Sequence, residues 1–205
     1  MENKKGNLII IIFLVFTIFG CASFTKRRFS NEIDNLKAED TAKIDGNYSY
    51  NPIKRYYNFQ KQTLEDQNVD SLRYNNAYDF LLNKSYNKNL KSDGTNKLKN
   101  NIEINLKLEN NNLLKVKVIE NQKIIKDTTL TGKFRNGMFY LNNKYLECNG
   151  VPYLFGGCRN SKRRIGITKT GNLLINEAVN NEGAILLLIG GGFSGNITFE
   201  YQKIK

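Results

Sequence analysis

The segment 102–118 constrains the fold of this chain more than any other. Apolar and polar side chains alternate over 102–108 and again over 114–118, and three asparagines at 110–112 separate the two runs. A period of two is typical of β-strands that bury one face, and an asparagine-rich break between two such runs predicts a hairpin. We therefore expect these two runs to be neighbouring antiparallel strands.

Shorter apolar runs farther along the chain predict additional strands. A third strand is expected over 123–134 and a fourth over 138–141, with a turn between them. Further strands are expected at 151–155, 164–168, 173–175, 184–189 and 197–204, with turns at 170–172 and 181–183. About eight or nine short strands at roughly 10–12-residue spacing indicate a mainly β fold, an antiparallel meander that forms a small barrel or sandwich.

The chain before these strands is less regular. Asp70 is a candidate N-cap for one short helix over 71–83, where apolar residues form a partial stripe. Residues 22–41 are polar and highly charged and show no apolar periodicity, so we expect 21–41 to be a flexible, disordered tether. The β domain is then expected to span residues 42–205.

The first 21 residues have the pattern of an export signal. Lys4 and Lys5 precede a 12-residue apolar run over 8–19, and Gly20 and Cys21 follow it. Twelve residues span about 18 Å as a helix, which is short of the roughly 20 residues that a bilayer crossing needs. The sequence therefore predicts a signal peptide over residues 1–20.

The sequence Ile18-Phe19-Gly20-Cys21 resembles the lipobox of bacterial lipoproteins, although Phe19 is bulkier than the residue usually found there. This resemblance implies cleavage before Cys21, acyl chains on that residue and a membrane anchor. Ala22 is not the Asp that retains lipoproteins at the inner membrane in the best-known Gram-negative sorting rule. The resemblance thus implies the inner leaflet of the outer membrane, facing the periplasm, with the inner membrane as the alternative.

A second resemblance concerns residues 42–205. Gly46 and Tyr48 before a run of hairpins loosely resemble the opening of lipocalin-like (calycin) barrels, although this chain lacks the tryptophan usual there. The chain also resembles the small, uncharacterised Asn/Lys-rich lipoproteins of Gram-negative bacteria. Neither resemblance implies a catalytic residue.

Two cysteines remain if Cys21 carries lipid. Cys148 and Cys158 flank a short segment with turn-forming ends, and in an oxidising compartment they are a possible disulfide. Such a bridge would stabilise the fold by roughly 3 kcal/mol. Two free thiols are the alternative interpretation. Two cysteines without histidine or a C-x-x-C spacing do not indicate a metal site.

Removal of residues 1–20 leaves 29 basic and 18 acidic residues. The densest basic cluster is Arg159, Lys162, Arg163 and Arg164, a possible site for an anion such as a lipid head group. A solvated turn is the alternative. Tyrosines between residues 48 and 57, interleaved with Lys54 and Arg55, could stack on a ligand, or simply pack a strand edge. An exported, lipidated chain is not expected to bind nucleic acid.

The chain contains no histidine, which excludes Ser-His-Asp and Cys-His catalysis and histidine metal sites. The glycine-rich run at 190–195 matches G-x-G-x-x-G, but Ile197, Phe199 and Tyr201 after it alternate as in a strand and not as in the helix that this motif needs, so we expect a flexible hairpin turn. We expect no catalytic residue and no cofactor. The sequence favours a binding module for a small hydrophobic ligand or an envelope partner; the alternative is a hydrolase or lipid-modifying enzyme that uses carboxylates.

Overall fold

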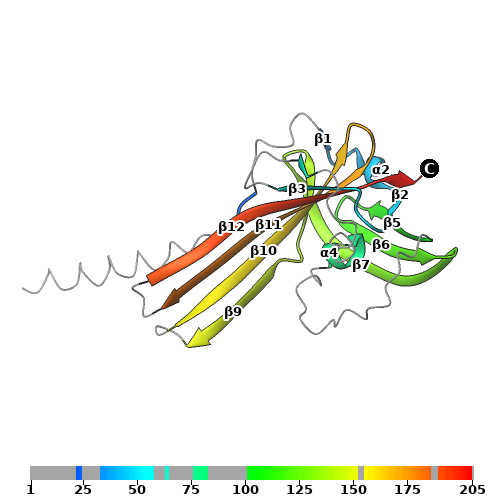
Figure 1. Cartoon of the computed structure of the whole chain (residues 1–205). Coiled ribbons are helices and arrows are strands. Elements are labelled where there is room, and N and C mark those ends of the chain that lie inside the picture. The colour runs from blue at the N-terminus through cyan, green and yellow to red at the C-terminus, as the bar shows by residue number, and fades with distance from the viewer. Residues whose placement is uncertain are drawn as a thin grey trace, which may run out of the picture.

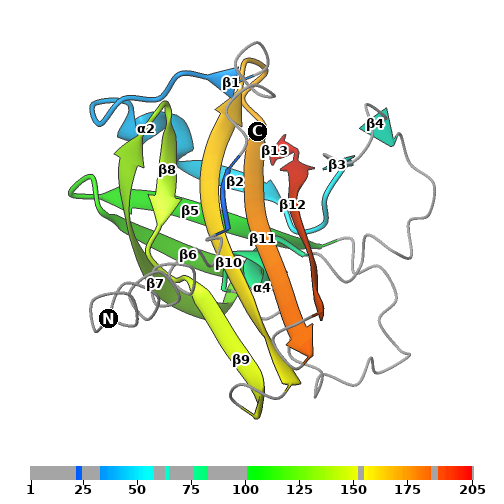
Figure 2. The same ribbon diagram turned by 90° about the vertical axis from the view of Figure 1, so that its left-hand side faces the viewer.

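A computed structural model describes residues 22–24, 33–57, 63–64, 76–82, 101–151, 155–185 and 189–204. This part of the chain is mainly antiparallel β structure with two short helices (Figures 1 and 2). The predicted fold class is therefore confirmed. The signal peptide and Cys21 lie outside the described residues.

The elements follow one another in a simple order. The N-terminal part contains β1 (Ile33–Asp34), α2 (Thr41–Ile44), β2 (Gly46–Ser49), β3 (Lys54–Tyr57), β4 (Thr63–Leu64) and α4 (Ala77–Leu81). The rest contains β5 (Ile102–Glu109), β6 (Leu113–Glu120), β7 (Lys123–Arg135), β8 (Met138–Leu141), β9 (Tyr145–Val151), β10 (Phe155–Thr168), β11 (Leu173–Ile185), β12 (Ile189–Tyr201) and β13 (Lys203–Ile204).

The strands form one continuous path in the order β13-β2-β5-β6-β7-β8-β10-β11-β12-β3-β4, and β1 and β9 also pair with β10. The two ends of this path do not pair with each other among the described strands, so the sheet is not closed into a barrel. Only Gln202 separates β12 from β13, although they lie far apart in the path. The sheet must therefore curl until its two parts face each other.

The core of the domain lies inside this curl. Alternate residues of β5 and β6 point into it, which is the reason for the period of two in the sequence. Helix α4 covers one side: the ring of Phe80 meets that of Phe199 edge-on, with the centroids 4.9 Å apart. The large fully buried side chains of the core include Tyr48, Phe80, Phe139, Phe199 and Tyr201.

Strands β10, β11 and β12 are much longer than the core requires. Their outer halves and β9 continue as a four-stranded sheet that projects from the rest of the domain (Figure 1). We call this sheet, residues 145–151, 155–161, 179–185 and 189–195, the arm. Its register is continuous from the row Tyr145–Ser161–Val179–Gly195 to the outer row Val151–Phe155–Ile185–Ile189.

Several predictions for this region were wrong. The expected strands at 151–155 and 184–189 each contain residues from two strand ends, because β9 ends at Val151 and β12 begins at Ile189. The expected turns at 181–183 and 190–195 lie inside β11 and β12. The arm residues with described exposure are mostly exposed or half-buried, so burial imposes no period on them and their glycines and asparagines look like turns.

The ordered domain also begins earlier than residue 42. Ile33 pairs with Thr168, and Leu36 is buried in the core, so the expected tether at 21–41 was too long. The sequence showed no apolar periodicity here, because one two-residue strand and one buried residue are too few to produce a period. The second short helix, α2, was not predicted. The predicted helix over 71–83 is shorter and begins after Asn76, whose side chain accepts from the N–H of Asp79 at 2.9 Å; Asp70 lies outside the described residues.

Candidate functional site

Most arm residues with described exposure are exposed or half-buried. A disulfide joins Cys148 of β9 to Cys158 of β10, with the sulfur atoms 2.09 Å apart, and the pairing expected from the sequence is present. The two cysteines are directly opposite in the register, and both are exposed. The bridge therefore fixes β9 on the arm although β9 has no other strand partner in the described chain.

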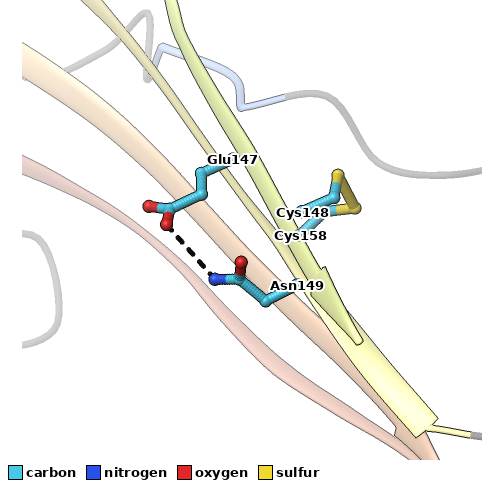
Figure 3. The surroundings of a disulfide bond; sticks show 4 residues. All are labelled: Glu147, Cys148, Asn149 and Cys158. Atoms are coloured by element: carbon cyan, nitrogen blue, oxygen red, sulfur yellow. Dashed lines mark hydrogen bonds between the residues drawn. A yellow bond between two sulfur atoms is a disulfide. The ribbon is translucent and has the colours of Figure 1, made fainter. Parts of the chain in front are cut away.

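The two faces of the arm differ at this bridge. The disulfide lies on one face, and the side chains of Glu147 and Asn149 lie on the other, as strand alternation requires (Figure 3). Glu147 accepts a hydrogen bond from the Asn149 amide at 3.2 Å and another from the hydroxyl of Tyr145. These three residues form a polar row on the face opposite the bridge.

Glycine is required in the arm where neighbouring backbones approach closely. A Cβ atom at Gly157 would lie 2.7 Å from the Glu182 carbonyl oxygen, and one at Gly192 would lie 2.4 Å from that of Asn181. Both distances are shorter than any normal contact. The glycines of β10 and β12 thus allow the strands to pack at this spacing. This explains the glycine-rich run at 190–195, for which the sequence predicted a turn.

The structure does not bring the four basic residues of the predicted anion site together. Because neighbours on a strand point to opposite faces, Arg159 and Arg163 lie on one face of β10 and Lys162 and Arg164 on the other. Arg163 is 1% exposed and Arg164 is 5% exposed. The predicted site for an anion over all four side chains is therefore not formed, and the two buried arginines have internal roles.

Arg163 forms a buried ion pair at the junction between arm and core. Its Nη2 donates to Oε1 of Glu177 at 2.5 Å, and both side chains are fully buried. The guanidinium also stands 5.3 Å from the centroid of the Phe80 ring, a cation–π contact. Arg163 and Glu177 are directly paired across β10 and β11. This pair fixes the point at which the long strands leave the core.

Arg164 lies on the opposite face and has neutral partners. Its Nε donates to the side-chain oxygen of Asn176 at 2.7 Å and its Nη1 to the Tyr140 hydroxyl at 3.0 Å. The guanidinium stacks 4.4 Å from the centroid of the Phe24 ring. Burial lowers the pKa of Arg164, and the hydrogen bond that Arg164 donates to Tyr140 partly offsets this shift.

Residues 22–24 are thereby held against the base of the arm. The Phe24 ring meets that of Tyr140 edge-on at 5.3 Å, and the Asn196 amide donates to the carbonyl of Ser23 at 3.1 Å. Ala22 is buried. The residue that follows Cys21 therefore packs on the sheet. The described residues include no helix that is long and apolar enough to span a membrane.

The tyrosines of the predicted stacking region serve different parts of the structure. Tyr48 is buried and its hydroxyl donates to the Ile44 carbonyl at 2.9 Å. Tyr56 donates to Oε2 of Glu200 at 2.5 Å. Burial raises the pKa of Tyr48 and Tyr50 well above the usual value. These contacts place the described tyrosines in packing and hydrogen-bonding roles.

Carboxylates do not converge among the buried residues that the structure describes. Glu177 pairs with Arg163 on the core face of the sheet, whereas Glu200 accepts from Tyr56 and from Asn172 on the other face. No group of three or more acidic or cysteine side chains suited to a metal ion occurs in the described chain. The arrangement offers a rigid, exposed β surface.

No protein family model matches this chain, and no curated protein or solved structure is significantly similar to it.

The arm was not identified from the sequence, although a signal for it was present. The turn expected at 170–172 joins β10 to β11, and counting outward from the pair Ile167–Leu173 brings Arg163 opposite Glu177. The same count keeps the two strands paired as far as Phe155 and Ile185. A register extended from that turn would thus have predicted both the ion pair and the length of the hairpin.

Proposed function

We propose that this protein is a lipid-anchored envelope lipoprotein whose β domain is a non-catalytic binding module that acts through the arm. One observation carries the proposal: β10, β11 and β12 continue past the core as an exposed sheet braced by a disulfide. A protein that needs only a stable core has no use for this extension. An exposed, rigid sheet suits recognition of another macromolecule.

The packing of the core favours a partner over a small hydrophobic ligand. The side chains that would line an open barrel are in contact with one another, and α4 adds Phe80 and Leu81 to the same cluster. The carboxylate enzyme receives less support, because the two buried glutamates lie on opposite faces and have internal partners. Partner binding by the arm therefore agrees best with the geometry.

The anchor remains part of the proposal and comes from the sequence. The signal-like segment and Cys21 support lipid attachment, and Ala22 supports the inner leaflet of the outer membrane facing the periplasm. Cys21→Ser is expected to abolish labelling of the protein by a palmitate analogue in growing cells. Labelling that persists in this variant would contradict the lipoprotein assignment.

The role of the arm can be tested with a photo-crosslinking residue in the full chain in cells. Leu146 on the arm and Ile124 on β7 are both apolar and exposed, at 70% and 55%, and form a matched pair of sites. Benzoylphenylalanine at 146 is expected to give a discrete crosslinked protein product upon illumination, and the same residue at 124 is not. The absence of any product from 146, or equal products from both sites, would contradict recognition by the arm.

A further inference from the structure

The two outer strands of the arm each have an edge that pairs with no described strand. β9 pairs only with β10, and β12 meets β3 only over Ile197–Glu200. We call residues 145–151 the β9 edge and residues 189–196 the β12 edge. Exposed, unpaired strand edges bind other strands readily, and most proteins block them.

The register shows which backbone groups point outward from β9. The Cα atoms of Cys148 and Cys158 are 4.0 Å apart. This is close to the roughly 4.5 Å spacing of a directly opposed pair without mutual hydrogen bonds, and far from the roughly 5.5 Å of a hydrogen-bonded pair. The N–H and C=O of Cys148 therefore point away from β10. By alternation, those of Leu146 and Gly150 do so too.

The backbone groups of β12 also alternate between the two sides of the strand. The carbonyl of Glu200 accepts from the N–H of Ile53 at 2.7 Å, so this residue directs its backbone groups away from β11. The pairing of β12 with β11 has no register shift from Ile189 to Tyr201. Alternation then directs the backbone groups of Gly192 and Ser194 outward as well.

Apart from Glu147, neither edge carries the charged residues and prolines that usually protect against pairing. The β9 edge reads YLECNGV and the β12 edge reads IGGGFSGN, with no lysine and no proline in either. Leu146 and Phe193 are exposed apolar residues on these edges, at 70% and 51%. Nothing in the described chain lies within 4 Å of a Cβ built at Gly191. Both edges are therefore accessible and uncharged except for Glu147.

The two edges are complementary to each other. They lie on opposite sides of one four-stranded antiparallel sheet, so β9 and β12 run in opposite directions. A second copy that places its β9 beside β12 continues the same antiparallel sheet. The edges contain seven and eight residues, so they match in length, and copies of the chain joined in this way satisfy both edges with a single kind of contact.

We propose that the arm is a self-assembly site, at which the β12 edge of one copy pairs with the β9 edge of the next. When Val151 of the second copy lies beside Ile189, the outer rows of the two arms are continuous. Ser194 then lies opposite Leu146 of the second copy, and Gly192 lies opposite its Cys148. The contact is head-to-tail, so it forms rings or chains of copies. This inference rests on the proposed role of the arm and names the partner as a second copy of the chain.

Proline substitution at the outward-pointing residues tests the proposal without removing a hydrogen bond inside the arm. Ser194→Pro and Leu146→Pro each delete one outward N–H, and Ser194→Ala and Leu146→Val retain it. The full chain, purified in detergent, is expected to have at least twice the protein mass of a monomer by light scattering. Ser194→Pro prevents pairing of the β12 edge and Leu146→Pro prevents pairing of the β9 edge, so each variant alone is expected to be monomeric. Both control variants are expected to assemble as the parent protein does.

Mixing the two proline variants separates the outcomes further. Each variant retains the edge that the other has lost, so the mixture is expected to form a dimer and nothing larger; this dimer also shows that both variants are folded. A parent protein that is monomeric in detergent and gives no self-crosslink from position 146 would overturn the proposal. So would Leu146→Pro dimers, which would show a symmetric contact between β12 edges.

The crosslinked product from position 146 distinguishes this inference from the proposed function. A product that contains only this chain supports self-assembly. A product with a different protein overturns self-assembly but leaves the arm as the binding element. No product at all contradicts both.

Discussion

The buried ion pair at the base of the arm makes the sharpest prediction about stability. Glu177→Gln removes the negative charge and leaves the Arg163 guanidinium in the core, where both side chains are fully buried. Loss of one partner of a buried ion pair costs about 3–5 kcal/mol, because the remaining charge lacks both water and a counter-ion. For a domain of this size, the cost corresponds to a fall in Tm of about 6–20 °C.

The assay is thermal unfolding of the purified protein, followed by far-ultraviolet circular dichroism with the disulfide intact. Glu103→Gln is the matched control, since Glu103 is half-buried and accepts from the neutral Asn47 amide at 3.3 Å. The control is expected to change the free energy of unfolding by less than about 0.5 kcal/mol.

A double variant isolates the contribution of charge. Arg163→Met combined with Glu177→Leu replaces both groups with apolar side chains, and replacement of a whole buried pair is often neutral. We expect this variant to unfold within about 1.5 kcal/mol of the parent. If Glu177→Gln costs less than about 1 kcal/mol, or if the double variant is as unstable as the sum of its parts, the reasoning is refuted.

Three further predictions concern pH, the disulfide and glycine. Burial raises the pKa of Tyr48 above its ordinary value of 10.0, so the stability it contributes below about pH 10 is lost as the pH rises further. The part of the tyrosinate absorbance that Tyr48→Phe removes should rise together with unfolding, and titration of that part near pH 10 in the folded protein would contradict this. Replacement of Cys148 and Cys158 by serine should lower the stability of the arm by about 3 kcal/mol. Backbone hydrogen exchange should then become faster in β9 but not in β5, and an equal increase in both strands would contradict a local role of the disulfide. Gly132→Ala should lower the free energy of unfolding by about 2 kcal/mol or more, because its Cβ would lie 2.5 Å from the Tyr140 carbonyl oxygen. In the same denaturation assay Gly191→Ala should be neutral or slightly stabilising, since a Cβ there meets no atom of the described chain within 4 Å. An unchanged stability of Gly132→Ala would contradict the close packing at this position.

The half of the domain that buries one sheet face could be predicted from the sequence. In β5 and β6 the alternating apolar residues at 104–108 and 114–118 are buried and the polar residues between them are half-buried or exposed, so the pattern and the structure carry the same information. The pairing of Cys148 and Cys158, one of two alternatives that the sequence left open, is also present. These features depend on local periodicity and short separations, which a single sequence records directly.

The arm could not be recognised in the same way. Its residues lack one buried face, so no period distinguishes β11 from a loop, and the glycines of β12 that permit close backbone approach also favour turns. The buried roles of Arg163 and Arg164 were missed for a related reason. Four basic residues within six positions look like a surface patch unless the alternation of a strand is applied to them.

The docking of residues 22–24 has a consequence for how far the domain can stand from a bilayer. Ser23 is held to Asn196 at the base of the arm, and it lies only two positions after the proposed lipid position at Cys21. An extended link of two residues spans about 7 Å, whereas a coil of twenty would range over about 25 Å. With Cys21 acylated, the base of the arm would lie close to the head groups. Neighbouring copies would then meet in the plane of the membrane, with their arms at a similar distance from the head groups.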